Sequence, residues 1–339
     1  MIICLITAVK KFSMIKVLSI ISLFYFSCEE KSVNNEDELV ILGCTDSLAI
    51  NYNINANKSD NSCEYAGCTN SESVNFDNNA TVDDGNCIDE EDVPNGYHLF
   101  WNDEFNQNSL DTSHWNMEVL WPGAFNNESQ SYTNNQGNIF LQNGLLHIRA
   151  MKEIPFNPSQ PAYTSGRINT KDKMELQYGL WQIRAKLPSG VGTWPAIWML
   201  NSNIDSEGWP FCGEIDIMEH VGYDPDRVFF SIHNEALYGN VHGTEQQGVY
   251  ELEGLENNFH IFSIEWDSTS IKGYIDGTMY YYYEKPAQSG YNSWPYDNPF
   301  FLIINLAIGG EWGGQQGIDN SIFPASFMID YVRMFKKIR

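Results

Sequence analysis

The chain has 339 residues and a formal net charge of −25, with 44 acidic and 19 basic residues. Such an excess of negative charge repels nucleic acid, anionic lipid surfaces and sulfated polysaccharides, so an uncharged glycan is the better match as a binding partner. The length allows one large domain of about 240 residues with small appendages.

Residues 1–28 have the pattern of a targeting sequence. Lysines precede the apolar stretch 17–26, which is too short to span a bilayer and fits the core of a signal peptide. Ser27-Cys28 at its end resembles a bacterial lipoprotein site, in which Cys28 becomes lipidated. We therefore expect an exported lipoprotein of the outer membrane or cell surface, attached to the membrane only through the lipid at Cys28. A secreted or periplasmic protein is the alternative.

A duplication follows the linker at residues 29–42. Segment 43–65 recurs as segment 67–89, each with two cysteines, and a second linker at 90–96 comes next. Cysteines in even number in an exported protein predict disulfides, although four cysteines allow three connectivities. The simplest pairing joins Cys44 to Cys63 and Cys68 to Cys87. Segments so polar and rich in turns serve readily as spacers, and adhesion through the repeats is the alternative.

The remaining residues, 97–338, have the pattern of an all-β domain. Short alternating runs such as 179–187, 259–266 and 271–275 are separated by Gly, Asn and Pro, and no long segment has a clean helical period. These features predict a β-sandwich. Cys212 has no evident partner, so we expect it to be a buried free thiol.

The most informative segment is EIDIME at residues 214–219, which places three carboxylates on an apolar, strand-forming stretch. In a regular strand Glu214 and Asp216 share a face and Glu219 points the other way, but a β-bulge near Met218 returns Glu219 to their face. The two Glu carboxyl groups then approach to roughly 5 Å, the spacing of retaining glycosidases. Such crowding holds one proton near neutral pH. For an isolated motif, an exposed acidic strand or a cation site is the alternative interpretation.

Seven segments stand out in this order along the chain: 101–105, 126–132, 165–168, 190–200, 213–220, 299–310 and 330–333. Together they resemble glycoside hydrolases of family 16, and in particular the laminarinase-like branch that cleaves β-1,3-glucans internally. The resemblance covers about residues 97–338. It implies a β-jelly roll of two stacked antiparallel sheets, with the substrate in a groove across the concave sheet. It also implies catalysis without a cofactor.

By this resemblance the three carboxylates have distinct roles. Glu214 is the nucleophile that forms a glycosyl-enzyme, Asp216 supports it by hydrogen bonding, and Glu219 is the general acid that then serves as base. Net retention is the expected stereochemistry, and transglycosylation is an alternative fate of the covalent intermediate.

The resemblance also implies residues that contact the sugar. Aromatic side chains are expected to stack on glucose rings and polar ones to bind hydroxyl groups. The expected stacking residues are Trp194, Trp198 and Trp312, and the expected polar contacts are Asn127, Arg167 and His233. The alternatives are core or loop packing for the tryptophans, a turn cap or a carboxylate partner for Asn127 and Arg167, and a structural role for His233.

A structural Ca²⁺ is a further implication of the resemblance. Glu104 and Asp330, with a backbone carbonyl near Gly144, fall where many family members hold this ion, and hard oxygen ligands suit it. Two ordinary surface acids are the alternative. We expect the protein to be a monomer.

The leading function is therefore an endo-acting β-1,3-glucanase for laminarin-type glucans. A mixed-linkage β-1,3-1,4-glucanase or a hydrolase of agarose-type galactans would use the same carboxylates in a reshaped groove. Met218 favours the laminarinase side over the shorter ExDxE motif of bacterial lichenases. A glucan-binding protein without activity is disfavoured, because it would leave a costly buried acid pair unexplained.

Overall fold

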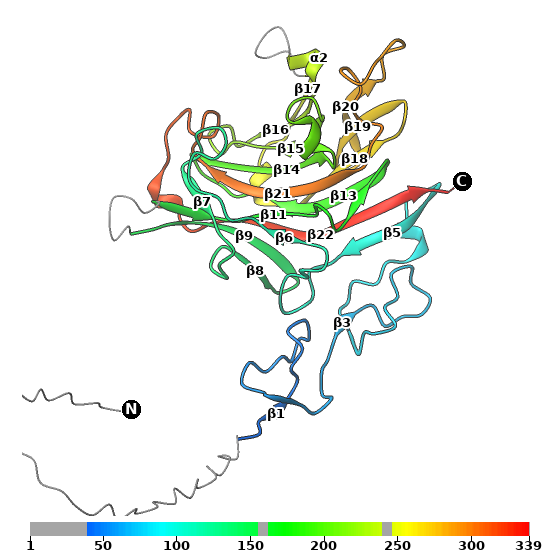
Figure 1. Cartoon of the computed structure of the whole chain (residues 1–339), viewed down its shortest axis with the longest axis vertical. Helices are drawn as coiled ribbons and strands as arrows, with labels where there is room; N and C mark the ends of the chain where they lie inside the picture. Colours follow the sequence, from blue (N-terminus) through cyan, green and yellow to red (C-terminus); the bar gives the residue numbers. More distant parts are fainter. Residues whose placement is uncertain (1–38, 155–161, 239–245, 339) are drawn as a thin grey trace, which may run out of the picture. The chain divides into compact units, whose positions relative to one another are not determined.

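The computed structural model describes residues 39–154, 162–238 and 246–338 (Figure 1). The expected signal peptide at 1–28, its Cys28 and most of the linker at 29–42 lie outside the described residues and stay predictions. Among the residues that are described, no helix has the length and apolar composition needed to cross a membrane.

Each Cys repeat folds around one disulfide. The bonds join Cys44 to Cys63 and Cys68 to Cys87, which confirms the simplest of the pairings that the sequence allowed. A short pair of parallel strands accompanies each bond. These strands are β1 (Leu42–Gly43) with β2 (Lys58–Ser59), and β3 (Ala66–Gly67) with β4 (Val82–Asp83).

The larger of two stacked sheets has ten strands among the described residues. In chain order they are β5 (Tyr97–Asp103), β7 (Gln130–Tyr132), β8 (Ile139–Gln142), β9 (Leu145–Lys152), β10 (Tyr163–Ser165), β13 (Gly179–Lys186), β18 (His260–Trp266), β19 (Ser270–Ile275), β20 (Thr278–Glu284) and β22 (Ala325–Lys337). In space the order is β20-β19-β18-β13-β22-β9-β10-β7, with β5 paired to β22 and β8 to β9. The pairs are antiparallel except β10 with β7.

The second sheet has eight strands among the described residues. They are β6 (Asn116–Met117), β11 (Arg167–Asn169), β12 (Glu175–Leu176), β14 (Thr193–Asn201), β15 (Glu214–Glu219), β16 (Arg227–His233), β17 (Gln246–Glu251) and β21 (Phe300–Ile308). The order is β17-β16-β15-β14-β21-β11-β6, with β12 also paired to β21. Figure 1 shows β14 and β21 in one layer and β22 and β9 in the other. The predicted all-β sandwich is confirmed.

Short helices complete the described chain. They are α1 (Ile204–Glu207), α2 (Glu235–Tyr238) and the 3-10 turns η1 (Glu90–Asp92), η2 (Leu255–Asn257) and η3 (Asn320–Ile322). Each has only three or four residues, so the two sheets bury their apolar faces mainly against each other.

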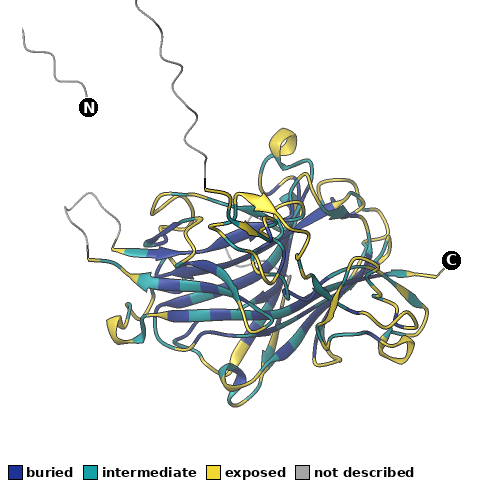
Figure 2. Ribbon diagram, turned by 90° about the horizontal axis from the view of Figure 1, so that it is seen from below, coloured by how far each residue is buried: buried dark blue, intermediate teal, exposed yellow. Residues whose placement is uncertain are grey.

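Alternating apolar residues explain why these segments form strands that pack as a sandwich. In β9 Leu146, Ile148 and Ala150 are buried and the residues between them only partly so, as expected for a strand with one face on the core. β21 is buried at all nine positions. Its even-numbered side chains, from Phe300 to Ile308, belong to the core cluster, and the odd-numbered ones lie on the opposite face. Figure 2 shows the buried residues concentrated in the strands and the exposed ones in the loops. Cys212 is a buried free thiol, as expected.

Candidate active site

One face of the eight-stranded sheet collects most of the residues that the sequence singled out. The side chains that enter the core from β14, β15, β16 and β21 include Ile197, Ile215, Ile232 and Ile304, all fully buried. In each of these strands the side chains that alternate with the core residues point to the opposite face, which we call the site face. It includes Arg167, Trp194, Trp198, Glu214, Asp216, Glu219, Ser231, His233 and Asn305.

A β-bulge in β15 puts Glu219 on the site face. Consecutive residues of β14 pair with Met218 and Asp216, so Ile217 is skipped in the register. The register between β15 and β16 shifts at the same point. Because Ile217 and Met218 are both fully buried, one step of alternation is absorbed and Glu219 returns to the face of Asp216. The bulge predicted from the motif is confirmed.

His233 on β16 contacts two of the three carboxylates. Its Nε2 lies 2.9 Å from Oδ2 of Asp216 and 3.8 Å from Oε1 of Glu214. Burial raises the pKa of Glu214 well above the ordinary value, the negative charges of Asp216 and Glu219 raise it further, and the charge of His233 lowers it. The cluster therefore holds a proton more strongly than an isolated acid does.

An aromatic wall stands at the Glu219 end of the cluster. Trp194 on β14 donates from Nε1 to Oε1 of Glu219 over 3.1 Å. The Trp312 ring packs edge-on against Trp194, with centroids 5.6 Å apart, and against Phe229 at 5.0 Å. All three rings are partly exposed. An indole N–H that holds a carboxylate at a partly exposed position is well placed to keep it oriented toward a ligand.

Trp198 and Arg167 lie together farther along the site face. Trp198 donates from Nε1 to Oδ1 of Asn305 over 2.7 Å, and the Arg167 guanidinium lies 4.8 Å from the Trp198 ring. Arg167 is buried, and its Nε pairs with the Glu118 carboxylate at 2.8 Å. A carboxylate partner was the alternative role for Arg167, and sugar contact by either residue stays a prediction.

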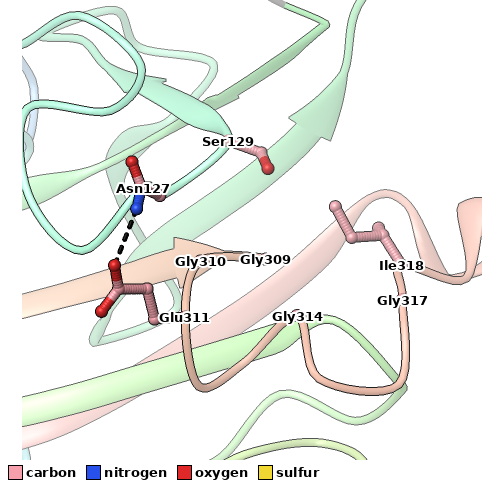
Figure 3. Close-up of a pocket in the computed structure, with 8 residues that line it drawn as sticks. All are labelled: Asn127, Ser129, Gly309, Gly310, Glu311, Gly314, Gly317 and Ile318. Atoms are coloured by element: carbon pink, nitrogen blue, oxygen red, sulfur yellow. Dashed lines mark hydrogen bonds between the residues drawn. The ribbon is translucent and has the colours of Figure 1, made fainter.

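Asn127 is exposed in the loop before β7 and lines a cavity (Figure 3). Its Nδ2 donates to Oε1 of Glu311 over 2.7 Å, so it too has a carboxylate partner. The cavity measures about 440 Å³ and lies between this loop and the glycine-rich segment that follows β21. Figure 3 shows Asn127 and Glu311 pointing toward each other across its edge, with Ser129 and Ile318 at the other end.

Two exposed aromatic residues near the site face were not among the predicted ones. The Trp209 ring lies 6.1 Å from His233, and the Phe125 ring lies 5.0 Å from the Arg167 guanidinium. They are 44% and 46% exposed. Both sit in loops rich in Gly and Pro, where core packing does not account for a large aromatic side chain. That context was the signal that could have found them.

A cation at the carboxylate cluster was an alternative interpretation of the sequence. Ligand atoms of Glu214, Asp216 and His233 lie within 4.8 Å of one another, a set of donors that suits a metal ion. A metal bound here would have to displace the proton that burial favours on Glu214, because a metal ligand must be deprotonated.

The residues expected to hold Ca²⁺ have arginine partners. Both carboxylate oxygens of Glu104 accept hydrogen bonds from Arg333, at 2.9 and 3.0 Å. Asp330 accepts one from Arg184. Both acids are thus engaged by guanidinium groups, which a bound cation would have to displace.

The chain is similar to known proteins over the sandwich. Residues 126–333 match the family described as glycosyl hydrolases family 16. A beta-glucanase from Rhodothermus marinus is 41% identical over 256 residues, which cover 73% of this chain and 88% of that protein. Glucan endo-1,3-beta-glucosidase A1 from Niallia circulans is 40% identical over 268 residues, covering 71% of this chain and 38% of its own length. The X-ray structure of the laminarinase from Rhodothermus marinus matches with a TM-score of 0.68 at 39% identity, covering 72% of this chain and 98% of that one.

Proposed function

This chain belongs to glycosyl hydrolase family 16, and from that premise we propose that it is a retaining endo-glycosidase that hydrolyses internal β-1,3-glucosidic bonds of laminarin-type glucans. One observation carries the proposal. The bulged strand β15 presents Glu214, Asp216 and Glu219 on one face, beside the partly exposed Trp194, in a sandwich 41% identical to a beta-glucanase.

The proposed reaction has two steps on the two Glu carboxylates. In the first, ionised Glu214 attacks the anomeric carbon and forms a C–O bond to it. The glycosidic C–O bond breaks, and Glu219 gives its proton to the departing sugar oxygen. In the second, a water gives a proton to Glu219 and attacks the same carbon, which releases Glu214. Two inversions give a product of retained configuration.

Asp216 and His233 position the nucleophile in this scheme. The hydrogen bond between Asp216 and Glu214 helps to hold one proton in the cluster. His233 bonds Asp216 as well, and its positive charge opposes the rise in the pKa of Glu214. Glu214 must be ionised to attack, so a group that lowers its pKa favours the reactive form.

The sugar-binding roles remain proposals. Trp194, Trp198 and Trp312 are partly exposed, which supports ring stacking. Asn127 lies at the edge of the cavity, and His233 is close enough to the nucleophile to contact a bound sugar as well. Arg167 has the weakest support, because it is buried against Glu118.

The two disulfides support export from the cytoplasm, since such bonds persist in oxidising compartments. A lipid anchor at Cys28, a location in the outer membrane or at the cell surface, and a monomeric state are the finer parts of this proposal. Catalysis in the family needs no cofactor. Separation of cells into soluble and membrane fractions, for the wild type and for Cys28→Ser, tests the anchor.

Calcium at Glu104, Asp330 and the Gly144 carbonyl stays a prediction from the resemblance. A site filled at one hundred times its Kd stabilises the folded state by about 2.7 kcal/mol. Chelation with EDTA then lowers Tm, and added Ca²⁺ restores it. An unchanged Tm leaves the two carboxylates as partners of arginines.

Product analysis tests the proposed function. The protein is incubated separately with laminarin, lichenan and agarose, and the products are analysed by mass and linkage, with Glu214→Gln as control. Short gluco-oligosaccharides from laminarin that are absent with the variant are the expected result. Cleavage of lichenan or agarose without laminarin moves the function to a mixed-linkage glucan or a galactan. No cleavage of any of the three favours a glucan-binding protein.

A further inference from the structure

A chain of buried hydrogen bonds leads to the Trp198 indole on the site face. Trp198 donates from Nε1 to Oδ1 of Asn305 over 2.7 Å, and Nδ2 of Asn305 donates to the Tyr132 hydroxyl oxygen over 3.1 Å. The Tyr132 hydroxyl donates to Oε2 of Glu128 over 3.0 Å. Glu128, Tyr132 and Asn305 are at most 7% exposed, so water competes little for these bonds. We call these four side chains the relay.

The two ends of the relay fix the direction of every bond in it. An indole N–H can only donate, and an ionised carboxylate can only accept. The Tyr132 hydroxyl therefore gives its single proton to Glu128, and its oxygen is left to accept from Asn305. This places the amide nitrogen of Asn305 toward Tyr132 and its oxygen toward Trp198, so the acceptor for the indole depends on the carboxylate at the other end.

Gln130 holds Glu128 in its role as an acceptor. Oε1 of Gln130 accepts from the backbone N–H of Ile308 over 2.7 Å, so its Nε2 faces Glu128 and donates to Oε2 over 2.7 Å. Burial raises the pKa of Tyr132 well above the ordinary value, and the negative charge of Glu128 raises it further. The Tyr132 hydroxyl thus keeps the proton that it donates.

The relay ends on the one polar atom of the Trp198 ring. A hydrogen bond from Nε1 limits rotation of the indole about its bond to the main chain. The Arg167 guanidinium lies over the ring, 4.8 Å from its centre, and covers one face. Trp198 is partly exposed, so the other face is the one that can meet a sugar.

We propose that Glu128 and Tyr132 are positioning residues, which act through the relay to hold the Trp198 indole as a platform for a glucose ring. The inference rests on the proposed function. Neither residue touches the glucan in this scheme, and neither takes part in the bond changes at the catalytic carboxylates. A platform contacts the sugar equally before and during bond cleavage, so loosening it raises KM and leaves kcat nearly unchanged.

Replacement of Tyr132 by phenylalanine breaks the relay at its middle and keeps the ring. The test measures kcat and KM on laminarihexaose for the full chain. Tyr274→Phe on β19 is the matched control, because it removes a similar bond, from the Tyr274 hydroxyl to Oε2 of Glu265 over 3.0 Å. We expect Tyr132→Phe to raise KM by about threefold to tenfold, the scale of one neutral hydrogen bond, with less than about a twofold change in kcat. Tyr274→Phe should change neither.

A double-mutant cycle shows whether Tyr132 acts through Trp198. Trp198→Phe keeps an aromatic ring but has no N–H, so the relay no longer reaches it. The addition of Tyr132→Phe to Trp198→Phe should therefore leave KM where the single variant has it. An equal rise of KM in both backgrounds would overturn the proposal, as would a Tyr132→Phe enzyme with an unchanged KM or with a loss confined to kcat.

A second pair of variants decides the question if Tyr132→Phe lowers Tm to the assay temperature. Glu128→Gln keeps an oxygen that can accept from Tyr132, whereas Glu128→Met has a similar length and no strong acceptor. We expect a KM near that of wild type for the first and a raised KM for the second, and equal values would overturn the proposal. A wild type that does not cleave laminarihexaose would refute the proposed function, and the inference with it.

Discussion

Replacement of His233 by alanine tests how the site keeps its nucleophile reactive. The change removes an imidazole whose Nε2 is 2.9 Å from Asp216 and 3.8 Å from Glu214. A hydrogen bond to a charged group contributes roughly 1.5–3 kcal/mol. Since each 1.4 kcal/mol is a factor of ten, we expect kcat/KM on laminarin to fall by about 10–100-fold.

The pH profile separates this role from a merely structural one. Burial is the largest cause of the raised pKa of Glu214, the charge of Asp216 adds to it, and the charge of His233 opposes it. Loss of His233 therefore raises the pKa of Glu214 further. Because the reaction needs ionised Glu214, the acidic limb of the kcat/KM profile should move to higher pH.

The assay is the initial rate of reducing-sugar release from laminarin across the pH range, at substrate concentrations well below KM. His233→Gln keeps a hydrogen-bond donor without the charge, so it should recover part of the rate and keep the shifted limb. His147→Ala, which changes a partly buried histidine on β9 of the other sheet, should leave the profile unchanged. An acidic limb that stays in place, or moves to lower pH, in His233→Ala would refute the reasoning.

Three more predictions concern the carboxylates and the repeats. Glu219→Gln should lower kcat on laminarin by about 10²–10⁴-fold, but should spare the first step on aryl laminariosides whose leaving group needs no proton; equal losses on both would contradict its role as acid. Glu214→Gln should be more stable than wild type at neutral pH by about 0.5–2 kcal/mol. Because the pKa of Glu214 is raised in the folded state, the wild type loses stability as pH rises above the ordinary pKa of 4.5. The difference in Tm between variant and wild type should therefore vanish below pH 4.5. A variant less stable than wild type at neutral pH would contradict this. Replacement of Cys68 and Cys87 together by serine should cost the second repeat about 3 kcal/mol and expose it to proteolysis, while activity on laminarin is unchanged; a parallel loss of activity would show that the repeat supports the site.

Local patterns in the sequence were sufficient for the features that depend on neighbours in the chain. The bulge could be predicted because Glu219 is an odd number of residues from Glu214 and Asp216, so in a regular strand it would point to the other face. The apolar Ile217 and Met218 favour a buried position. The disulfides followed from the short separation of the cysteines within each repeat. The roles of the carboxylates came from the resemblance to family 16.

Contacts between distant parts of the chain were beyond such patterns. Asn127 and Glu311 are 184 residues apart, and neither lies in a strand whose register would have brought them together. Trp209 was missed because a loop aromatic has no periodicity to reveal what it faces. The cavity itself depends on where the loop of Asn127 meets the glycine-rich segment, and this is set by the packing of β7 and β21 rather than by either loop alone.

Because of the bulge, β15 can differ by one residue in length without changing which carboxylates share a face. Insertion or deletion of one residue in a strand ordinarily turns every later side chain to the other face. Here, removal of Met218 would leave Glu, Asp and Glu in plain alternation, still on a common side, whereas its presence is absorbed by the bulge. A single codon gained or lost at this point therefore leaves the three carboxylates on one face. Enzymes with either strand length are accessible to each other in evolution and to the protein engineer.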